Sequence, residues 1–273
     1  MGVKILAIIA EAATVPACLD AAEAAACKVP NASLEALHVI VDPSKLVVAS
    51  EEIAFQRLRE VHEGPATERA KATRAAYLAW KEAHPAIDVP LHWKDLIGGE
   101  EEKVTEEAGE FDVLALAMPH NLDANDALHA AFFKIHHPLF LVPSEWSLKP
   151  GSSFADHIVI AWNDTRPCHN AVEGALPWLR AARDVTVLLI NEGETYERSV
   201  AHLLRREDIS YRAHYCPRDD ETLGDEILTK AHELGADLLV MGAYRHSEFV
   251  DWLLGGTTRH VLRHADLPLF MSH

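Results

Sequence analysis

The sequence has few cysteines and no long uninterrupted apolar run. Its four cysteines form no C-x-x-C or other close ligand pair, which argues against a zinc knuckle and against a disulfide framework. No segment has the apolar length needed to cross a bilayer. The run ILAIIA after Lys4 is short and is soon followed by the acidic Glu11, so we interpret it as a buried strand and not as a secretory signal. We therefore expect a cytoplasmic protein in a reducing compartment.

Basic residues are also scarce. The chain has 25 Lys and Arg against 42 Asp and Glu, which gives a formal net charge of -17. Such a field repels polyanions, so we expect neither a general role on nucleic acid nor binding to an anionic membrane. The acidic run Glu100 to Glu102, with Glu106, Glu107 and Glu110, lies on a predicted helix, and we interpret it as a solvated face.

The common catalytic motifs are missing as well. There is no G-x-S-x-G elbow, no G-x-x-x-x-G-K-[ST] loop and no G-x-G-x-x-G after the first strand of either half. His260 and His264 are spaced to share one helix face, but no Glu follows His260 as in H-E-x-x-H. A role at a helix terminus is therefore favoured over a metal site, and the same holds for His136 and His137. Without a fixed nucleophile, base or metal, we do not expect an enzyme.

What the sequence does contain is a regular alternation of apolar strands with helical patterns. This alternation predicts an α/β fold in which helices cover both faces of a parallel sheet. The predicted strands of the first half are Lys4–Ile9, Leu34–Val41, Asp88–Trp93, Asp112–Ala117 and Leu139–Val142. Those of the second half are His157–Trp162, Val185–Ile190, Ser210–Tyr215, Asp237–Met241 and Leu269–Met271.

The two halves look like copies of one unit. ILAIIAEA near the start matches IVIAWNDT, FDVLALA matches ADLLVMG, and HHPLFLV matches DLPLFMS. The polar segment Ser144 to Ser153 contains Pro and Gly and is interpreted as a linker, which predicts domains at 1–144 and 153–273. The first half also carries extra helical sequence around residues 51–84, interrupted by Gly64 and Pro65.

The halves differ most in their glycines. In the second half a short apolar run, Leu238 to Met241, ends at Gly242, and Gly255-Gly256-Thr257-Thr258 then leads into a helix. Glycines allow the backbone to approach an anion, and amides at a helix start point toward it. The alternative is that these glycines only form turns. The first half has no glycine between Glu110 and Lys149, so it lacks a phosphate loop and is interpreted as degenerate.

These features resemble the universal stress protein family in its tandem, two-domain form. The resemblance rests on the strand before Gly242, the spaced glycines, the closing DLPLFM and the segment AWNDTRP from Ala161. It implies two tandem adenine-nucleotide-hydrolase-like (Rossmann-like) domains, each a five-stranded parallel sheet with helices on both faces. The family's phosphate motif is G-x2-G-x9-G-[S/T]. Gly242 matches its first glycine and Gly255 its third, whereas Arg245 stands at the second glycine and Gly256 at the hydroxyl position, followed by Thr257 and Thr258.

In the family, a carboxylate after the first strand and a backbone group on the second strand hold the nucleoside. The resemblance places Asn163, with Asp164 beside it, and Ile190 at these positions. Asn163 can both donate and accept hydrogen bonds, so it could contact adenine or ribose without the usual charge. The alternative is that Asn163, Asp164 and Thr165 only cap the following helix. Trp252 lies in the glycine-bearing loop, where its ring could cover a nucleotide or contact a partner subunit.

The resemblance implies a sensing or signalling module whose second domain binds ATP, with magnesium, or a related nucleotide. Slow incidental ATP hydrolysis would be compatible with that role. The rival interpretation is a stress-associated interaction protein that binds no nucleotide, because Arg245 and Gly256 depart from the motif. The resemblance also implies protein partners of unknown identity and pairing of the two last strands within the chain, as a pseudodimer. A homodimer of chains is left open.

Overall fold

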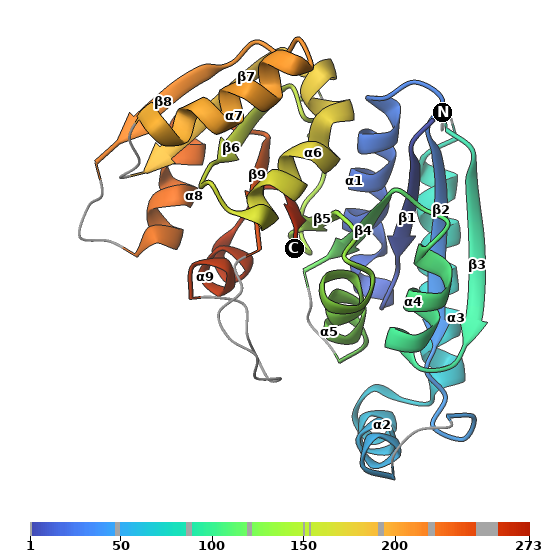
Figure 1. Cartoon of the computed structure of the whole chain (residues 1–273). Coiled ribbons are helices and arrows are strands. Elements are labelled where there is room, and N and C mark those ends of the chain that lie inside the picture. Colours follow the sequence, from blue (N-terminus) through green and yellow to red (C-terminus); the bar gives the residue numbers. More distant parts are fainter. Residues whose placement is uncertain are drawn as a thin grey trace. The chain divides into compact units, whose positions relative to one another are not determined.

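The computed structural model divides the chain into two compact units, residues 1–137 and 138–273 (Figure 1). It describes residues 2–46, 50–85, 89–118, 122–149, 151–152, 154–190, 194–217, 222–243 and 256–273. Both units alternate strands with helices, and the predicted α/β fold is confirmed. None of the described helices is long and apolar enough to span a bilayer.

Unit 1 contains a parallel sheet in the strand order β3-β2-β1-β4. Its strands are β1 (Lys4–Ile8), β2 (Ser33–Ile40), β3 (Leu91–Ile97) and β4 (Val113–Ala117). Its helical segments are η1 (Ala12–Thr14), α1 (Val15–Cys27), α2 (Ser50–Glu63), α3 (Ala66–Ala83), α4 (Glu100–Ala108), α5 (Leu122–His129) and the π-helical η2 (Ala130–Ile135). Helices α1 and α3 contact each other on one face, and α4, α5 and η2 contact one another on the other.

Unit 2 contains five parallel strands in the order β10-β9-β6-β7-β8, with β5 antiparallel to β10. The strands are β5 (Leu139–Val142), β6 (His157–Ala161), β7 (Asp184–Ile190), β8 (Arg212–Cys216), β9 (Leu238–Gly242) and β10 (Leu269–Ser272). The helices are α6 (Arg166–Ala181), α7 (Glu194–Arg206), α8 (Leu223–Glu233) and α9 (Gly256–His264). Helix α6 packs on β9 and β10, and α8 and α9 contact each other on the opposite face.

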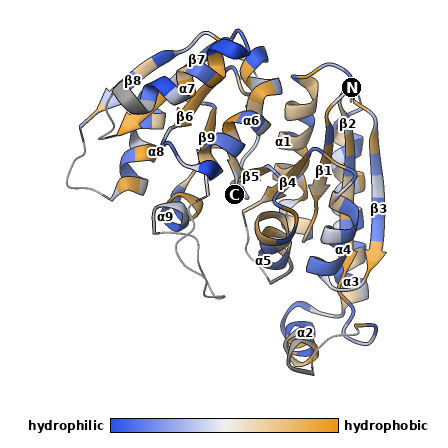
Figure 2. Ribbon diagram, viewed as in Figure 1, coloured by the Kyte–Doolittle hydropathy of each residue, from blue (hydrophilic) through white to orange (hydrophobic). Residues whose placement is uncertain are grey.

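The strand pattern reflects burial. Strands β1, β4 and β9 are apolar because helices cover both of their faces, and Figure 2 shows β1 and β4 as mostly hydrophobic ribbons. Strand β3 differs from the prediction: it begins at Leu91 and runs on to Ile97, paired with β2 along its whole length. As the outer strand of unit 1 it is only partly buried, so its sequence mixes polar and apolar residues, and the strand's limits could not be predicted from an apolar run. The predicted start, Asp88, lies outside the described residues.

Strand β5 groups with unit 2, although its sequence position is at the end of the first half. Its antiparallel pairing with β10 places Phe140 opposite Phe270. The rings of Phe140, Phe270 and Trp178 pack edge to face or tilted, with centroid separations of 4.8 to 5.5 Å, and all three side chains are fully buried. This aromatic cluster joins β5, β10 and α6 into one core.

The extra helical sequence of the first half forms α2 and α3, separated by Gly64 with a positive φ of 86°. Helix α3 packs against α1, η1 and β2 within unit 1, because its Tyr77 and Trp80 are buried. Trp80 Nε1 donates to Asp20 Oδ1 of α1 at 2.6 Å, which ties the two helices together.

One prediction for the acidic helix α4 is wrong. Glu102, Glu106 and Glu110 are exposed, as a solvated face requires, but Glu100 is only 2% exposed. It is the first residue of α4, where the helix dipole favours a carboxylate. The predicted pattern of surface charge therefore holds for one side of the helix and not for its start.

Candidate functional site

The sheet of unit 2 has a topological switch point between β6 and β9. From β6 the chain proceeds to β7 on one side, while β9 is followed by β10 on the other. Parallel sheets of this kind bind ligands outside the carboxyl ends of the strands at this point. The structure brings several predicted site residues to that edge: Asn163 and Asp164 after β6, Ile190 at the end of β7, Gly242 at the end of β9, and Gly256, Thr257 and Thr258 at the start of α9. Arg245, Trp252 and Gly255 lie outside the described residues.

The turn after β6 is held by hydrogen bonds of its own. Thr165 Oγ1 donates to Asn163 Oδ1 at 2.6 Å, and the Thr165 amide donates to the Asn163 carbonyl at 2.7 Å. Thr165 occupies the N-cap position of α6, but its side chain accepts no hydrogen bond from the helix. Thr165 is therefore at the capping position that the sequence suggested, but it does not cap the helix through its side chain. The amide nitrogen of the half-buried Asn163 donates to no described residue, so this group can serve a ligand.

Asp164 presents an ionised carboxylate at the same edge. Its Oδ1 lies 2.7 Å from His169 Nε2. Hydrogen bonds from His169 and from Ser199 of α7 lower the pKa of Asp164 below its ordinary value. The His169 ring meets the buried Trp162 edge to face, with centroids 4.7 Å apart. A fixed carboxylate can accept hydrogen bonds from the hydroxyls of a sugar, or contact a cation.

Gly242 is needed by the backbone itself. A Cβ atom at this position would lie 2.5 Å from the Cys168 amide nitrogen and 2.8 Å from the Pro167 carbonyl carbon. The first turn of α6 therefore passes directly over the end of β9, at a distance that only glycine permits. This packing accounts for Gly242 without any ligand, but through close backbone contact at the end of a strand and not through the turn that the alternative expected.

The start of α9 offers two accessible groups. Gly256 is exposed, and a Cβ atom added to it would meet no other atom within 4 Å, while Thr257 is half-buried. Thr258 is fully buried, so its hydroxyl does not face solvent. The first amides of a helix have no partners within the helix and carry its positive dipole end. Gly256 and Thr257 are thus the described residues of this segment best placed to meet an anion.

Sequence reasoning missed Cys168, His169 and Ser199. Cys168 is fully buried beneath the switch point, its thiol donates to the Ala161 carbonyl at 3.5 Å, and burial raises its pKa to about 12. Cys18 of unit 1 is placed alike, with its Sγ 3.6 Å from the carbonyl oxygens of Ile8 and Ala115. The run Arg166-Pro167-Cys168-His169 at a predicted helix start was the available signal. No sequence signal marked Ser199, because it lies on α7, far along the chain from Asp164.

His260 and His264 share a face of α9, as their spacing predicts. Their rings stack with centroids 4.1 Å apart, and His260 Nε2 lies 2.6 Å from Asp225 Oδ1 of α8. Within the described ranges, no three His, Cys, Asp or Glu side chains gather as metal ligands would. His260 thus joins α9 to α8, and His264 packs on the His260 ring.

The comparisons with known proteins agree with this architecture. Residues 192–273 match the model of the Universal stress protein family. A universal stress protein structure from Archaeoglobus fulgidus DSM 4304 is 16% identical, with a TM-score of 0.64, over 98% of this chain and 94% of that chain. A candidate universal stress protein from Pseudomonas aeruginosa UCBPP-PA14 is 13% identical, with a TM-score of 0.56, over 98% of this chain and 91% of that chain. A search of the curated proteins found no match.

At these identities the structural likeness establishes the fold, and the family match shows a similarity of residues 192–273. The match covers most of unit 2, including the start of α9 and both strands that flank it. Residues 192–273 are therefore similar to a universal stress protein domain, and the chain as a whole shares its fold with the universal stress protein structure from Archaeoglobus fulgidus DSM 4304.

Proposed function

We propose that unit 2 binds ATP or a related nucleotide at the carboxyl edge of β6, β7 and β9, and that the protein acts as a sensing or signalling module in the stress response. The observation that carries this proposal is the convergence of Asn163, Asp164 and the start of α9 at one switch point. The role that we propose is binding and not catalysis, because the Cys168 thiol at this edge is fully buried with a raised pKa and Asp164 is already hydrogen-bonded to His169.

Different residues at this edge suit different parts of a nucleotide. The Asn163 amide and the Ile190 backbone suit the nucleoside, and the Asp164 carboxylate suits a ribose hydroxyl or the magnesium that accompanies ATP. The exposed Gly256 and the half-buried Thr257, at the positive end of α9, suit the phosphates. Binding there would bias α9 toward one position and so change the surface shown to a partner.

The second candidate is an interaction protein without nucleotide. Two observations favour it: packing of α6 alone explains Gly242, and the Thr258 hydroxyl is buried. In this case the turn around Asn163 and the contact between Asp164 and His169 only hold α6 and α7 in place. In either case β10 pairs with β5 within unit 2, as expected for the last strands of the two sequence halves.

Calorimetric titration with ATP and magnesium tests the nucleotide proposal. We expect heat and a thermal shift in the wild type, and loss of both in Gly256→Asp. The new carboxylate would repel phosphate, yet it is favourable for folding at a helix start. Gly256→Ala is the matched control and should retain binding, because the position is open and the amides remain. No heat and no shift at millimolar ATP would rule out the proposal. Mass spectrometry of the native protein for bound nucleotide then separates it from the rival.

A further inference from the structure

Helix α7 carries a row of cations on one exposed face. The exposed residues of this row are Arg198, His202, Arg205 and Arg206. The last three follow Arg198 by four, seven and eight residues, which places all four on one side of the helix. Arg206 pairs with Glu207, but Arg198 and His202 have neither a hydrogen bond nor an ion pair to any described residue. Like charges so close repel one another, and the chain as a whole is strongly acidic. The row is therefore a local positive patch on a protein whose net charge is negative.

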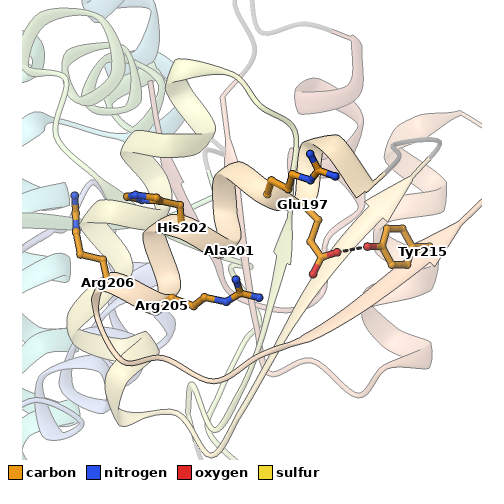
Figure 3. A pocket seen from close by; sticks show the side chains of 7 residues that line it. Glu197, Ala201, His202, Arg205, Arg206 and Tyr215 are labelled. Carbon is orange, nitrogen blue, oxygen red and sulfur yellow. Dashed lines mark hydrogen bonds between the residues drawn. The ribbon is translucent and has the colours of Figure 1, made fainter.

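These cations border a hollow of about 670 Å³ between α7 and β8, which we call the α7–β8 groove. It is lined by Glu197, Arg198, Ala201, His202, Arg205, Arg206 and Tyr215 (Figure 3). The carboxylate in this lining is already occupied, since Glu197 accepts hydrogen bonds from the hydroxyls of Tyr211, at 2.8 Å, and Tyr215. The groove thus presents arginines to solvent while its acidic group is held by two phenols.

Strand β8 forms one side of the groove and ends the sheet of unit 2. It pairs with β7, and no other described strand lies on its far side. Tyr211, just before β8, and Tyr215 within it both donate to Glu197 of α7, so this side of the strand faces the helix. Between them Ala213 is small and exposed. A chain added to this edge would therefore also direct every second side chain toward α7.

We propose that the α7–β8 groove binds an extended acidic segment of a partner protein, which adds to β8 as an edge strand and places alternate carboxylates beside Arg198 and Arg205. The two arginines are seven residues apart, or about 10 Å along the helix, and alternate strand residues are about 7 Å apart. Flexible arginine side chains bridge that difference, and each guanidinium can bind a carboxylate with two hydrogen bonds. The residues of this groove are not those proposed to bind the nucleotide, and the proposal does not depend on nucleotide binding.

Fluorescence anisotropy with a labelled octapeptide of alternating Glu and Val tests this inference. We expect saturable binding that weakens with salt. The double variant Arg198→Glu/Arg205→Glu should bind about tenfold more weakly, because two attractions become repulsions. The control Arg57→Glu makes the same kind of charge change at an exposed position of α2 and should stay within about twofold of wild type. Matching thermal melts would show that both variants are folded.

Two further probes decide between strand addition and simple charge attraction. In a peptide of alternating Glu and Pro the charge is the same, but half of the backbone N–H donors are gone, so it should bind clearly more weakly. Equal affinity for the two peptides would refute strand addition. Tighter binding of a ten-nucleotide single-stranded DNA, lost in the same double variant, would assign the groove to nucleic acid and overturn the proposal. No binding of the Glu and Val peptide below about 1 mM would also overturn it.

Discussion

Replacing Gly242 by alanine tests whether close backbone packing, and not a ligand, requires this glycine. The new Cβ would lie 2.5 Å from the Cys168 nitrogen, 2.8 Å from the Pro167 carbonyl carbon and 2.9 Å from the Cys168 Cα. All three are backbone atoms of the first turn of α6, so no side-chain rotation can relieve the contact. The helix start must move away from β9 by about 1 Å to restore ordinary van der Waals separation.

The loss of unfolding free energy in Gly242→Ala depends on which parts of the core move with the first turn of α6. Helix α6 packs on β9 and β10 through fully buried side chains, among them Val172 and Trp178, so its shift disturbs the core of unit 2. Overpacking of this kind typically costs 1–3 kcal/mol, and the rigid backbone obstacle places Gly242→Ala at about 2–3 kcal/mol. For a domain of this size the corresponding fall in Tm is about 6–15 °C.

Urea and thermal unfolding, followed by circular dichroism and tryptophan fluorescence, measure this effect. Gly256→Ala is the matched control: its Cβ meets open space at the start of α9, so its free energy of unfolding should change by no more than about 0.5 kcal/mol or rise slightly. If Gly242→Ala also costs less than about 0.5 kcal/mol with an unchanged m-value, the packing argument fails. Loss of nucleotide binding without loss of stability would then assign Gly242 to the ligand.

Two more predictions concern side chains in both units. Cys27 is the exposed thiol, whereas Cys18, Cys168 and Cys216 are buried, and burial raises the pKa of Cys18 and Cys168 to about 12. Ellman's reagent should therefore titrate one of the four thiols rapidly in the native protein and all four in guanidinium; a second fast thiol would contradict this burial. Hydrogen bonds from Tyr215 and Tyr211 lower the pKa of Glu197, so the stabilisation they give is present above the ordinary glutamate pKa and is lost as the pH falls through the lowered value. The difference in unfolding free energy between wild type and Tyr215→Phe should thus be constant near neutral pH and shrink below about pH 4, and a difference that grows on acidification would contradict the assignment.

Most of the fold could be predicted because its signals are local. Strands such as β6, β7 and β9 are short apolar runs with polar residues at their ends, and their predicted limits agree with the structure to within about two residues. The prediction for strand β3 lies several residues too early, because an outer strand need not be apolar on both faces. The prediction that Glu100 faces solvent fails because its burial depends on what packs over the start of α4, which a run of charges does not show.

The candidate site was predictable only in part. The order of strand, turn and helix brings Asn163, Asp164 and Gly256 to one edge, and that order is written in the sequence. The hydrogen bond between Asp164 and Ser199, and the approach of Cys168 to Gly242, join residues far apart along the chain. No local pattern marks such contacts. The roles of Arg245 and Gly255 stay predictions, since both lie outside the described residues.

The sequence by itself determined the α/β class, and it predicts the duplication and the absence of a phosphate loop from the first half, because periodicity and glycine spacing act within a few residues of chain. Only the tertiary structure decided that Gly242 makes room for α6, that Thr258 is buried while Gly256 is exposed, and that β5 pairs with β10. The physical reason is that burial and close backbone contact depend on which distant elements meet, and a parallel sheet brings together strands that long crossovers separate along the chain.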